Sequence, residues 1–380
     1  MMIKPFSIDG KPAKFNLSSF ILLEPESYLK WIDITMRSLY NEMGMESFYK
    51  RKEQLLKTIS SLPDSEQEKY SKKWFSDMKA HLESSASSGS LLVVNSHLER
   101  FLNYDEEYIK EISSVGIWQF VVKYEVFPMQ DILIKNILTH CADVEVASKE
   151  VDILHHQKAY SKIADAVHAS PTLLLYIRPQ LQNYVAASKT DKEILLVQTF
   201  GLLEFLFSQV PMMDVVLNKK GITQTRCFTP MLHTHDHQTI KPGQAFFHFI
   251  QDLLGVETIG QMEILGQKCS KDGYYSTASE ATLKRWSSGK EFPKPKTFFR
   301  FMKTCLKNAN KDNRELQDLI WYYYWGAKRF YLIQKFIQYI LQSAEHRKLF
   351  FNLSEAETIC EWMVGRYEFW LQHWSAQKLS

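Results

Sequence analysis

The sequence lacks the paired cysteines on which disulfide-stapled and zinc-ribbon proteins depend. Its five cysteines are odd in number, lie far apart and form no CxxC pair, which is typical of reduced thiols in a cytoplasmic protein. The first residues, MMIKPFSIDGKPAKF, contain no apolar segment of the kind that a secretory signal requires. We therefore expect a cytoplasmic location.

Long uninterrupted apolar runs are also missing. The most apolar stretch, 194–217, is broken by Glu204, Pro211 and Asp214, and carboxylates deep in a bilayer are costly. This stretch is predicted to be a buried helix, and no membrane partner is expected.

The common signatures of enzymes are absent as well. The chain has no phosphate-binding GxxxxGK[ST], no GxGxxG after a strand and no GxSxG nucleophile elbow. We therefore expect no catalytic residues, no cofactor and no enzymatic activity.

What the 380 residues do contain is helical periodicity. Apolar side chains recur at helix-compatible intervals in most segments, and sustained alternation is rare. The pattern predicts an all-α, multi-helix protein with an embedded helix-turn-helix-like module. We expect an N-terminal helical region at 1–83, a second helical region at 91–217, a polar loop or linker at 218–243, the helix-turn-helix-like module at 244–310 and aromatic-rich C-terminal helices at 311–380.

The C-terminal region opens with RELQDLIWYYYWGAKRF, which would place aromatic rings on all sides of a helix. Such a helix is predicted to be buried on more than one face, so core packing is favoured over base stacking for the rings of 321–325. Further along, Ser354 and Glu357 have capping-box spacing and predict the start of another helix.

Positive charge is concentrated in one stretch. The net charge is +3, yet 282–311 contains nine lysines and arginines and a single acid, Glu291, which leaves −5 on the rest of the chain. A local charge of +8 attracts polyanions whatever the total charge.

The first part of this basic stretch carries the signals of a short helix. Thr277 and Glu280 have capping-box spacing and Ser279 is a second candidate cap, so a helix is expected to begin within 278–280. Its outward-facing residues are expected to be Glu280, Ala281, Lys284, Arg285 and Ser288.

The inward side and the following connection can also be predicted. Leu283 and Trp286 are three residues apart and would face a core. Gly289 suits the left-handed conformation that ends many helices, and Pro293 and Pro295 hold the connection extended. A second helix is expected to follow, with apolar positions at Phe298, Phe299, Phe301, Met302 and Cys305.

The segment TLKRWSSGKEFPKPKTFFRFMKTCL resembles the second half of a Cro/repressor-type (XRE-like) helix-turn-helix domain. In that family a recognition helix ending in Trp-x-x-Gly-Lys is followed by a proline-containing turn and an apolar helix. The resemblance covers about 245–310, where 245–269 could supply the first two helices. The sequence departs from the family at SKDGYYSTA, which lengthens a normally short turn, and at Ser287, where the family often has glutamate or asparagine. The sequence leaves open whether the longer connection lets the recognition helix reach a groove of DNA.

The resemblance implies double-stranded DNA as the partner and a regulatory role. It places Glu280 and Ala281 at base-facing positions, and Arg285, one turn on, within reach of guanine. The lysines that it assigns to phosphates, which add affinity and salt dependence without sequence choice, are Lys284, Lys290, Lys294 and Lys296. The alternative is that these lysines merely solvate an ordinary helix pair.

A second constellation is HTHDH, which contains His233, His235 and His237. Alternate residues of an extended segment share a face, so three imidazoles could meet one zinc ion. The pattern is similar to the HxHxDH signature of metallo-β-lactamase-like hydrolases, but one residue and the expected strands are missing. A polar loop is the favoured interpretation.

Taken together, these features predict a DNA-binding transcriptional regulator. The first 240 residues would bind a ligand or a protein partner, or would assemble a homodimer. Two alternatives stay open: a helical protein-interaction scaffold with a degenerate helix-turn-helix, and a metal-dependent enzyme that uses HTHDH.

Overall fold

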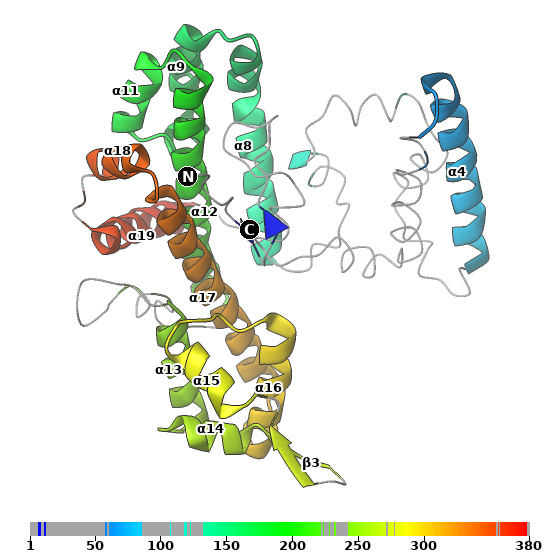
Figure 1. Cartoon of the computed structure of the whole chain (residues 1–380), viewed down its shortest axis with the longest axis vertical. Coiled ribbons are helices and arrows are strands. Elements are labelled where there is room, and N and C mark those ends of the chain that lie inside the picture. Colours follow the sequence, from blue (N-terminus) through cyan, green and yellow to red (C-terminus); the bar gives the residue numbers. More distant parts are fainter. Residues whose placement is uncertain are drawn as a thin grey trace. The chain divides into compact units, whose positions relative to one another are not determined.

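The computed structural model describes the chain in segments, drawn as coloured ribbons in Figure 1. The described residues are 7–8, 11–12, 58, 61–85, 107, 118–119, 122, 132–221, 223, 228, 232, 242–270, 273–276, 278–354, 356 and 358–377. The chain divides into two compact units, with one boundary inside a long helix, between Gln198 and Thr199. The five-region division expected from the sequence stays a prediction.

The predicted all-α fold is confirmed. In the described segments, helices account for nearly all regular structure, and two short antiparallel pairs of strands are the exceptions. The helices are α4 (Asp64–Ser85), α8 (Ile132–His156), α9 (Tyr160–His168), α10 (Pro171–Leu174), α11 (Pro179–Ala187), α12 (Asp191–Lys219), α13 (Pro242–Leu254), α14 (Ile259–Leu265), α15 (Glu280–Ser287), α16 (Pro295–Asn308), α17 (Arg314–Ile340), α18 (Ala344–Ser354) and α19 (Ile359–Ala376). The strands are β1 (Ser7–Ile8), β2 (Lys11–Pro12), β3 (Gln267–Ser270) and β4 (Gly273–Ser276).

In the unit that contains α8, shorter helices pack on this long helix. α9 contacts both α8 and α11, and α10 contacts α8 and α9. Val144 of α8 and Ile163 of α9 are completely buried. α10 begins where the Ser170 side chain accepts the backbone N–H of Leu173, which satisfies one of the free donors of a helix start.

The apolar stretch 194–217 lies in α12 and is a buried helix, as predicted. Among the described residues, α12 alone is long and apolar enough to cross a membrane, and its most apolar window is entirely buried inside the protein. Its Glu204 carboxylate accepts hydrogen bonds from Arg366 and Trp370 of α19, each at 2.6 Å. Asp214 accepts one from the Tyr367 hydroxyl at 2.6 Å. These bonds offset the cost of burying two carboxylates.

α17 is buried on several sides, which confirms the prediction for the aromatic-rich region. Tyr323, Tyr324 and Trp325 are buried, whereas Trp321 is partly exposed. The Tyr323 and Tyr324 rings pack against Phe246 of α13, with centroids 6.3 and 5.9 Å away. These rings therefore serve core packing, and α17 supports the helices that follow the polar loop.

α13, α14, α15 and α16 form one group, at the residues where the helix-turn-helix-like module was expected (lower part of Figure 1). α13 contacts α15 and α17, while α14 contacts α15 and α16. α14 begins with a reciprocal capping box between Thr258 and Gln261. Met262, Phe298 and Phe301 are buried between these helices.

The segment that lengthens the connection between α14 and α15 forms a β-hairpin. β3 and β4 pair antiparallel, with Gln267 opposite Ser276. Figure 1 shows the hairpin projecting beyond the helices of the module. The longer connection thus forms a separate two-stranded hairpin that extends away from the helices of the module.

The start of the last helix differs from the sequence expectation. Ser354 is the final residue of α18 and not a cap. α19 begins after Thr358, whose side chain accepts the Glu361 N–H while the Glu361 carboxylate accepts the Thr358 N–H. Because α18 continues to Ser354 with Phe350 buried, the second of two similar capping patterns is the one that starts a helix.

Candidate nucleic-acid interface

The start of α15, the predicted recognition helix, is held by two side-chain acceptors. The Ser279 hydroxyl accepts the Thr282 N–H at 3.3 Å, so the helix begins within the expected range. The Glu263 carboxylate of α14 accepts the Glu280 N–H at 3.1 Å. An acid here suits the positive end of the helix dipole and occupies the place at which a phosphate could otherwise bind. Thr277, the other candidate cap, lies outside the described residues.

The end of α15 is a Schellman motif. Gly289 has a φ of 66°, in the left-handed region predicted for it. The Gly289 N–H bonds the Trp286 carbonyl at 3.0 Å, and the Lys290 N–H bonds the Arg285 carbonyl at 3.1 Å. This pair of bonds satisfies the last carbonyls of the helix and turns the chain sharply into the next segment.

Leu283 and Trp286 seat α15 on the module, as predicted. Both side chains are buried. The Trp286 ring meets the edges of Phe298 and Phe301, with centroids 6.3 and 6.1 Å apart. These contacts fix one side of α15 and leave the opposite side facing outward.

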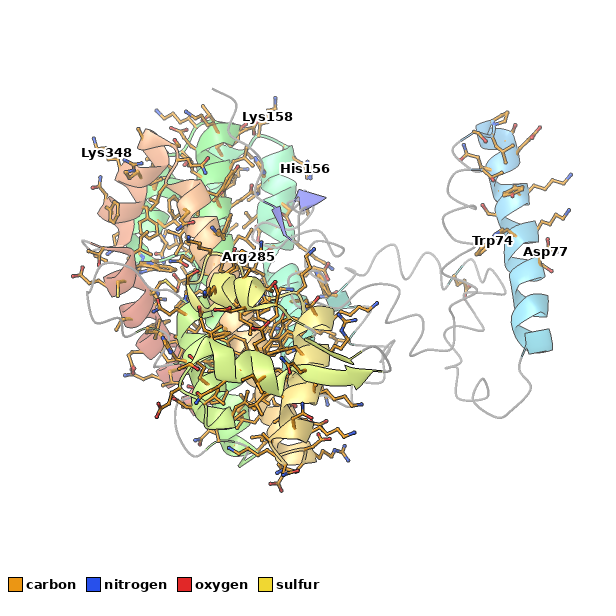
Figure 2. All side chains as sticks on the ribbon, turned by 60° about the horizontal axis from the view of Figure 1, so that its bottom comes forward. Trp74, Asp77, His156, Lys158, Arg285 and Lys348 are labelled. Atoms are coloured by element: carbon orange, nitrogen blue, oxygen red, sulfur yellow. The ribbon has the colours of Figure 1, made fainter. Side chains whose placement is uncertain are left out.

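The outer side of α15 carries the four residues of this helix that are predicted to contact DNA. Glu280, Ala281, Lys284 and Arg285 are all exposed, and Figure 2 labels Arg285 on this helix. The hairpin does not cover them. The structure thus brings these four predicted residues together on one accessible surface.

The charged side chains on this surface are paired with one another. Glu280 and Lys284 form an ion pair at 2.7 Å, and the hydrogen bond to Glu280 raises the pKa of Lys284. The Arg285 Nε lies 3.2 Å from the carboxylate of Glu291. Because the cationic side chains of Lys284 and Arg285 are paired with the carboxylates of Glu280 and Glu291, the exposed face of α15 is close to neutral.

Unpaired positive charge follows directly after the helix. Lys290, Lys294 and Lys296 are exposed, and none has an ion-pair partner among the residues that the structure describes. The loop that carries Lys290 and Lys294 is fixed, because the Tyr324 hydroxyl of α17 donates to the Pro293 carbonyl at 2.7 Å. Of the three predicted phosphate-binding lysines outside α15, Lys290 and Lys294 therefore lie on a positioned loop, and Lys296 lies in the first turn of α16.

The remaining cations of the basic stretch divide into two kinds. Arg300, Lys303 and Lys307 lie exposed on α16. The Lys311 ammonium donates to the Leu253 carbonyl at 2.9 Å, at the C-terminal end of α13, where a cation is favoured. Lys311 therefore has a structural contact.

Two residues of the site were not predicted. Glu263 caps α15, and the Asn308 side chain donates to the carbonyls of Leu265 and Gln267 at 2.8 and 2.9 Å, which ties α16 to the base of the hairpin. Both act on backbone groups of a different element. No sequence spacing encodes such contacts.

The HTHDH constellation lies outside the described residues, including His233, His235 and His237. Within the part of the chain that is described, no group of three or more histidine, cysteine or acidic side chains is arranged to hold a metal ion. The metal site remains a sequence prediction.

A comparison with protein-family models finds no match to this chain, and searches of curated proteins and of solved structures find no significant match either. The likeness to a helix-turn-helix domain therefore stays a prediction from the sequence of residues 245–310.

Proposed function

We propose that this chain binds double-stranded DNA through residues 244–310 and acts as a transcriptional regulator in the cytoplasm. The observation that supports this most directly is the surface around α15. A short helix, seated by two buried side chains, exposes Glu280, Ala281 and Arg285 and is followed by Lys290, Lys294 and Lys296, which have no ion-pair partner among the described residues. An α-helix of this kind fits the major groove, where base edges are distinguishable.

Arg285 is the residue proposed to select a base. Its guanidinium can donate two bonds to guanine O6 and N7, and to do so it must leave Glu291, its partner at 3.2 Å. A guanine at the right position replaces the contact of Arg285 with Glu291. Another base cannot accept both hydrogen bonds, so Arg285 stays paired with Glu291 and adds nothing to binding. The exchange therefore supports selectivity more than raw affinity.

Glu280 is proposed to accept a hydrogen bond from an exocyclic amino group such as cytosine N4. The same carboxylate is bound to Lys284 at 2.7 Å. On binding, Lys284 can turn from Glu280 to a phosphate, which couples base recognition to backbone contact.

The test is a selection from random duplexes, followed by titration of the full chain with the selected duplex and with a scrambled one. Arg285→Ala should relax the preference at one base pair by about 1–3 kcal/mol, and Lys294→Ala should weaken all duplexes alike. Lys348→Ala, on α18 (Figure 2), removes a lysine outside the module and should change neither. Failure to bind any duplex at low salt would contradict the proposal.

The near-neutral face of α15 favours one alternative. Because Glu280 and Glu291 neutralise Lys284 and Arg285, the same surface could accept a protein segment as a scaffold. This alternative predicts that the chain binds a protein partner and that duplex DNA does not compete. The salt titration with duplex DNA separates this alternative from the proposed DNA binding. Sedimentation of the free chain would show whether a homodimer forms.

A further inference from the structure

We propose that the β3–β4 hairpin is a second DNA-contacting element, which lies along the duplex beside the groove that α15 enters. This inference rests on the proposed function. It concerns β3 and β4, most of which lie in the segment SKDGYYSTA, where the sequence departs from the helix-turn-helix family. The hairpin would extend the binding site to base pairs that α15 cannot reach.

The position of the hairpin is the first argument. β4 ends at Ser276, and the cap of α15 is Ser279. The N-terminal part of a recognition helix is the part that meets base edges. An element joined this closely to that end of α15 must leave the module near the bound duplex.

The second argument is that the hairpin is anchored at its base. Asn308 of α16 donates to the carbonyls on either side of Gly266, those of Leu265 and Gln267. Gly266 packs so closely on the ring of Phe301 that a Cβ atom there would overlap it. These contacts set the direction in which β3 leaves α14, so the hairpin has a defined orientation relative to the module.

The third argument is that the hairpin has no sheet partner. In the residues described, β3 and β4 pair only with each other, and an isolated two-stranded hairpin is marginally stable in water. Both of its edges present backbone donors and acceptors. A two-stranded ribbon fits a DNA groove, and its N–H groups can bind phosphate oxygens.

The sequence of the segment fits this partner. It contains Lys268 and Lys271 against one acid, Asp272, and two tyrosines. Four residues per strand, at about 3.3 Å each, reach about 13 Å. At about 3.4 Å per base pair, the hairpin would cover about four additional base pairs.

The structure suggests a clean deletion. Gln267 and Ser276 are directly opposed in the ladder, so an Asn-Gly turn can join them and replace residues 268–275. Gln267, which Asn308 holds, and the Ser279 cap remain in place. A second variant, Lys268→Ala with Lys271→Ala, keeps the hairpin, and Lys348→Ala is the matched control.

The experiment is a hydroxyl-radical footprint of the full chain and of each variant on the selected duplex, with a salt titration. The deletion should shorten the footprint by about four base pairs on one side. The double lysine variant should lower the slope of log K against log salt by about 2, at about 0.9 per phosphate contact. The base preference set by Arg285 should not change.

Each outcome decides the matter. If the unmodified chain binds but the deletion keeps the full footprint and salt slope, the hairpin proposal is wrong while the proposed function stands. If the deletion instead changes the oligomeric state, the hairpin contacts a second copy and not DNA. If the unmodified chain binds no duplex, both proposals fail. Should the deletion variant not fold, the double lysine variant gives the answer.

Discussion

Gly289 determines how the chain passes from α15, the proposed recognition helix, to the loop that carries Lys290 and Lys294. Its φ of 66° lies in a region that residues with a Cβ atom rarely adopt. The Schellman bonds of Trp286 and Arg285 depend on this conformation. One backbone angle therefore sets the relation between the side chains proposed to read bases and those proposed to bind phosphates.

Gly289→Ala should destabilise the protein by about 1–2 kcal/mol, because alanine is strained in the left-handed region, and should weaken duplex binding. Urea denaturation and anisotropy measure the two effects. Gly365→Ala is the matched control, since a Cβ there meets no atom within 4 Å and α19 should gain about 0.5–1 kcal/mol. Equal effects of the two substitutions would refute the role given to Gly289.

Asp152 of α8 should make stability depend on pH. Burial away from water, followed by the charge of Glu145, raises the pKa of Asp152 to about 7. No described residue bonds its Oδ2. The unfolded pKa is about 3.9, so the folded protein binds the proton more tightly. The stability that protonated Asp152 contributes is therefore fully present below about pH 4 and is lost as the pH rises towards 7.

Asp152→Asn should flatten this dependence and should stabilise the protein at pH 8, by at most about 4 kcal/mol for three pKa units. Thermal unfolding between pH 4 and 8 measures it, with the exposed Asp165→Asn of α9 as control. Parallel curves for the unmodified protein and Asp152→Asn would show that Asp152 does not titrate in this range.

At the scale of elements, local signals were predictable and cross-element contacts were not. Leu283, Trp286 and Gly289 follow from spacing and from glycine's conformational freedom, and the structure has them as expected. The Asn308 anchor joins α16 to a distant backbone, and no periodicity reports it. SKDGYYSTA was recognised as extra length, but without clear alternation of apolar residues its hairpin could not be foreseen.

The capping patterns show the same limit. Ser354 and Thr358 each precede a glutamate at the same spacing, so sequence alone cannot choose between them. The choice is made by α18, which continues to Ser354. Tertiary packing decides which of two adequate caps is used.

The contact between α12 and α19 supports a stability prediction. The Glu204 carboxylate lies 2.5 Å from Arg366 Nη2, and both side chains are almost completely buried. Glu204→Ala should cost about 3–5 kcal/mol, because it leaves a buried guanidinium without its carboxylate. Urea denaturation measures the loss.

The paired variant Glu204→Met with Arg366→Met should recover part of that stability, since apolar side chains of similar volume often replace a buried ion pair without loss. The recovery is incomplete because the buried Trp370 N–H loses its acceptor, at about 1–3 kcal/mol. If the paired variant is as unstable as Glu204→Ala, the energetic role assigned to the unpaired charge is wrong.

At the scale of the whole molecule, positive charge is concentrated in one segment of the chain. The chain carries +3 in total but +8 within 282–311. Not all of that charge is available, since Lys284 and Arg285 are paired with acids and Lys311 binds a carbonyl. Among the lysines of this stretch that are predicted to bind phosphates, Lys290, Lys294 and Lys296 should therefore contribute more of the salt dependence than Lys284.

The salt dependence of duplex binding is the sharpest test of whether residues 244–310 bind DNA. The full chain is titrated with its selected duplex between 50 and 200 mM salt, beside a variant with Lys290, Lys294 and Lys296 all changed to alanine. The slope of log K against log salt from the module should lie between about −2.7, for three lysines, and about −3.6, if Lys284 also reaches a phosphate, and the two hairpin lysines would add about −1.8. The triple variant should lose about 2.7 of that slope. A slope near zero, or no binding to any duplex at the lowest salt, would contradict the account.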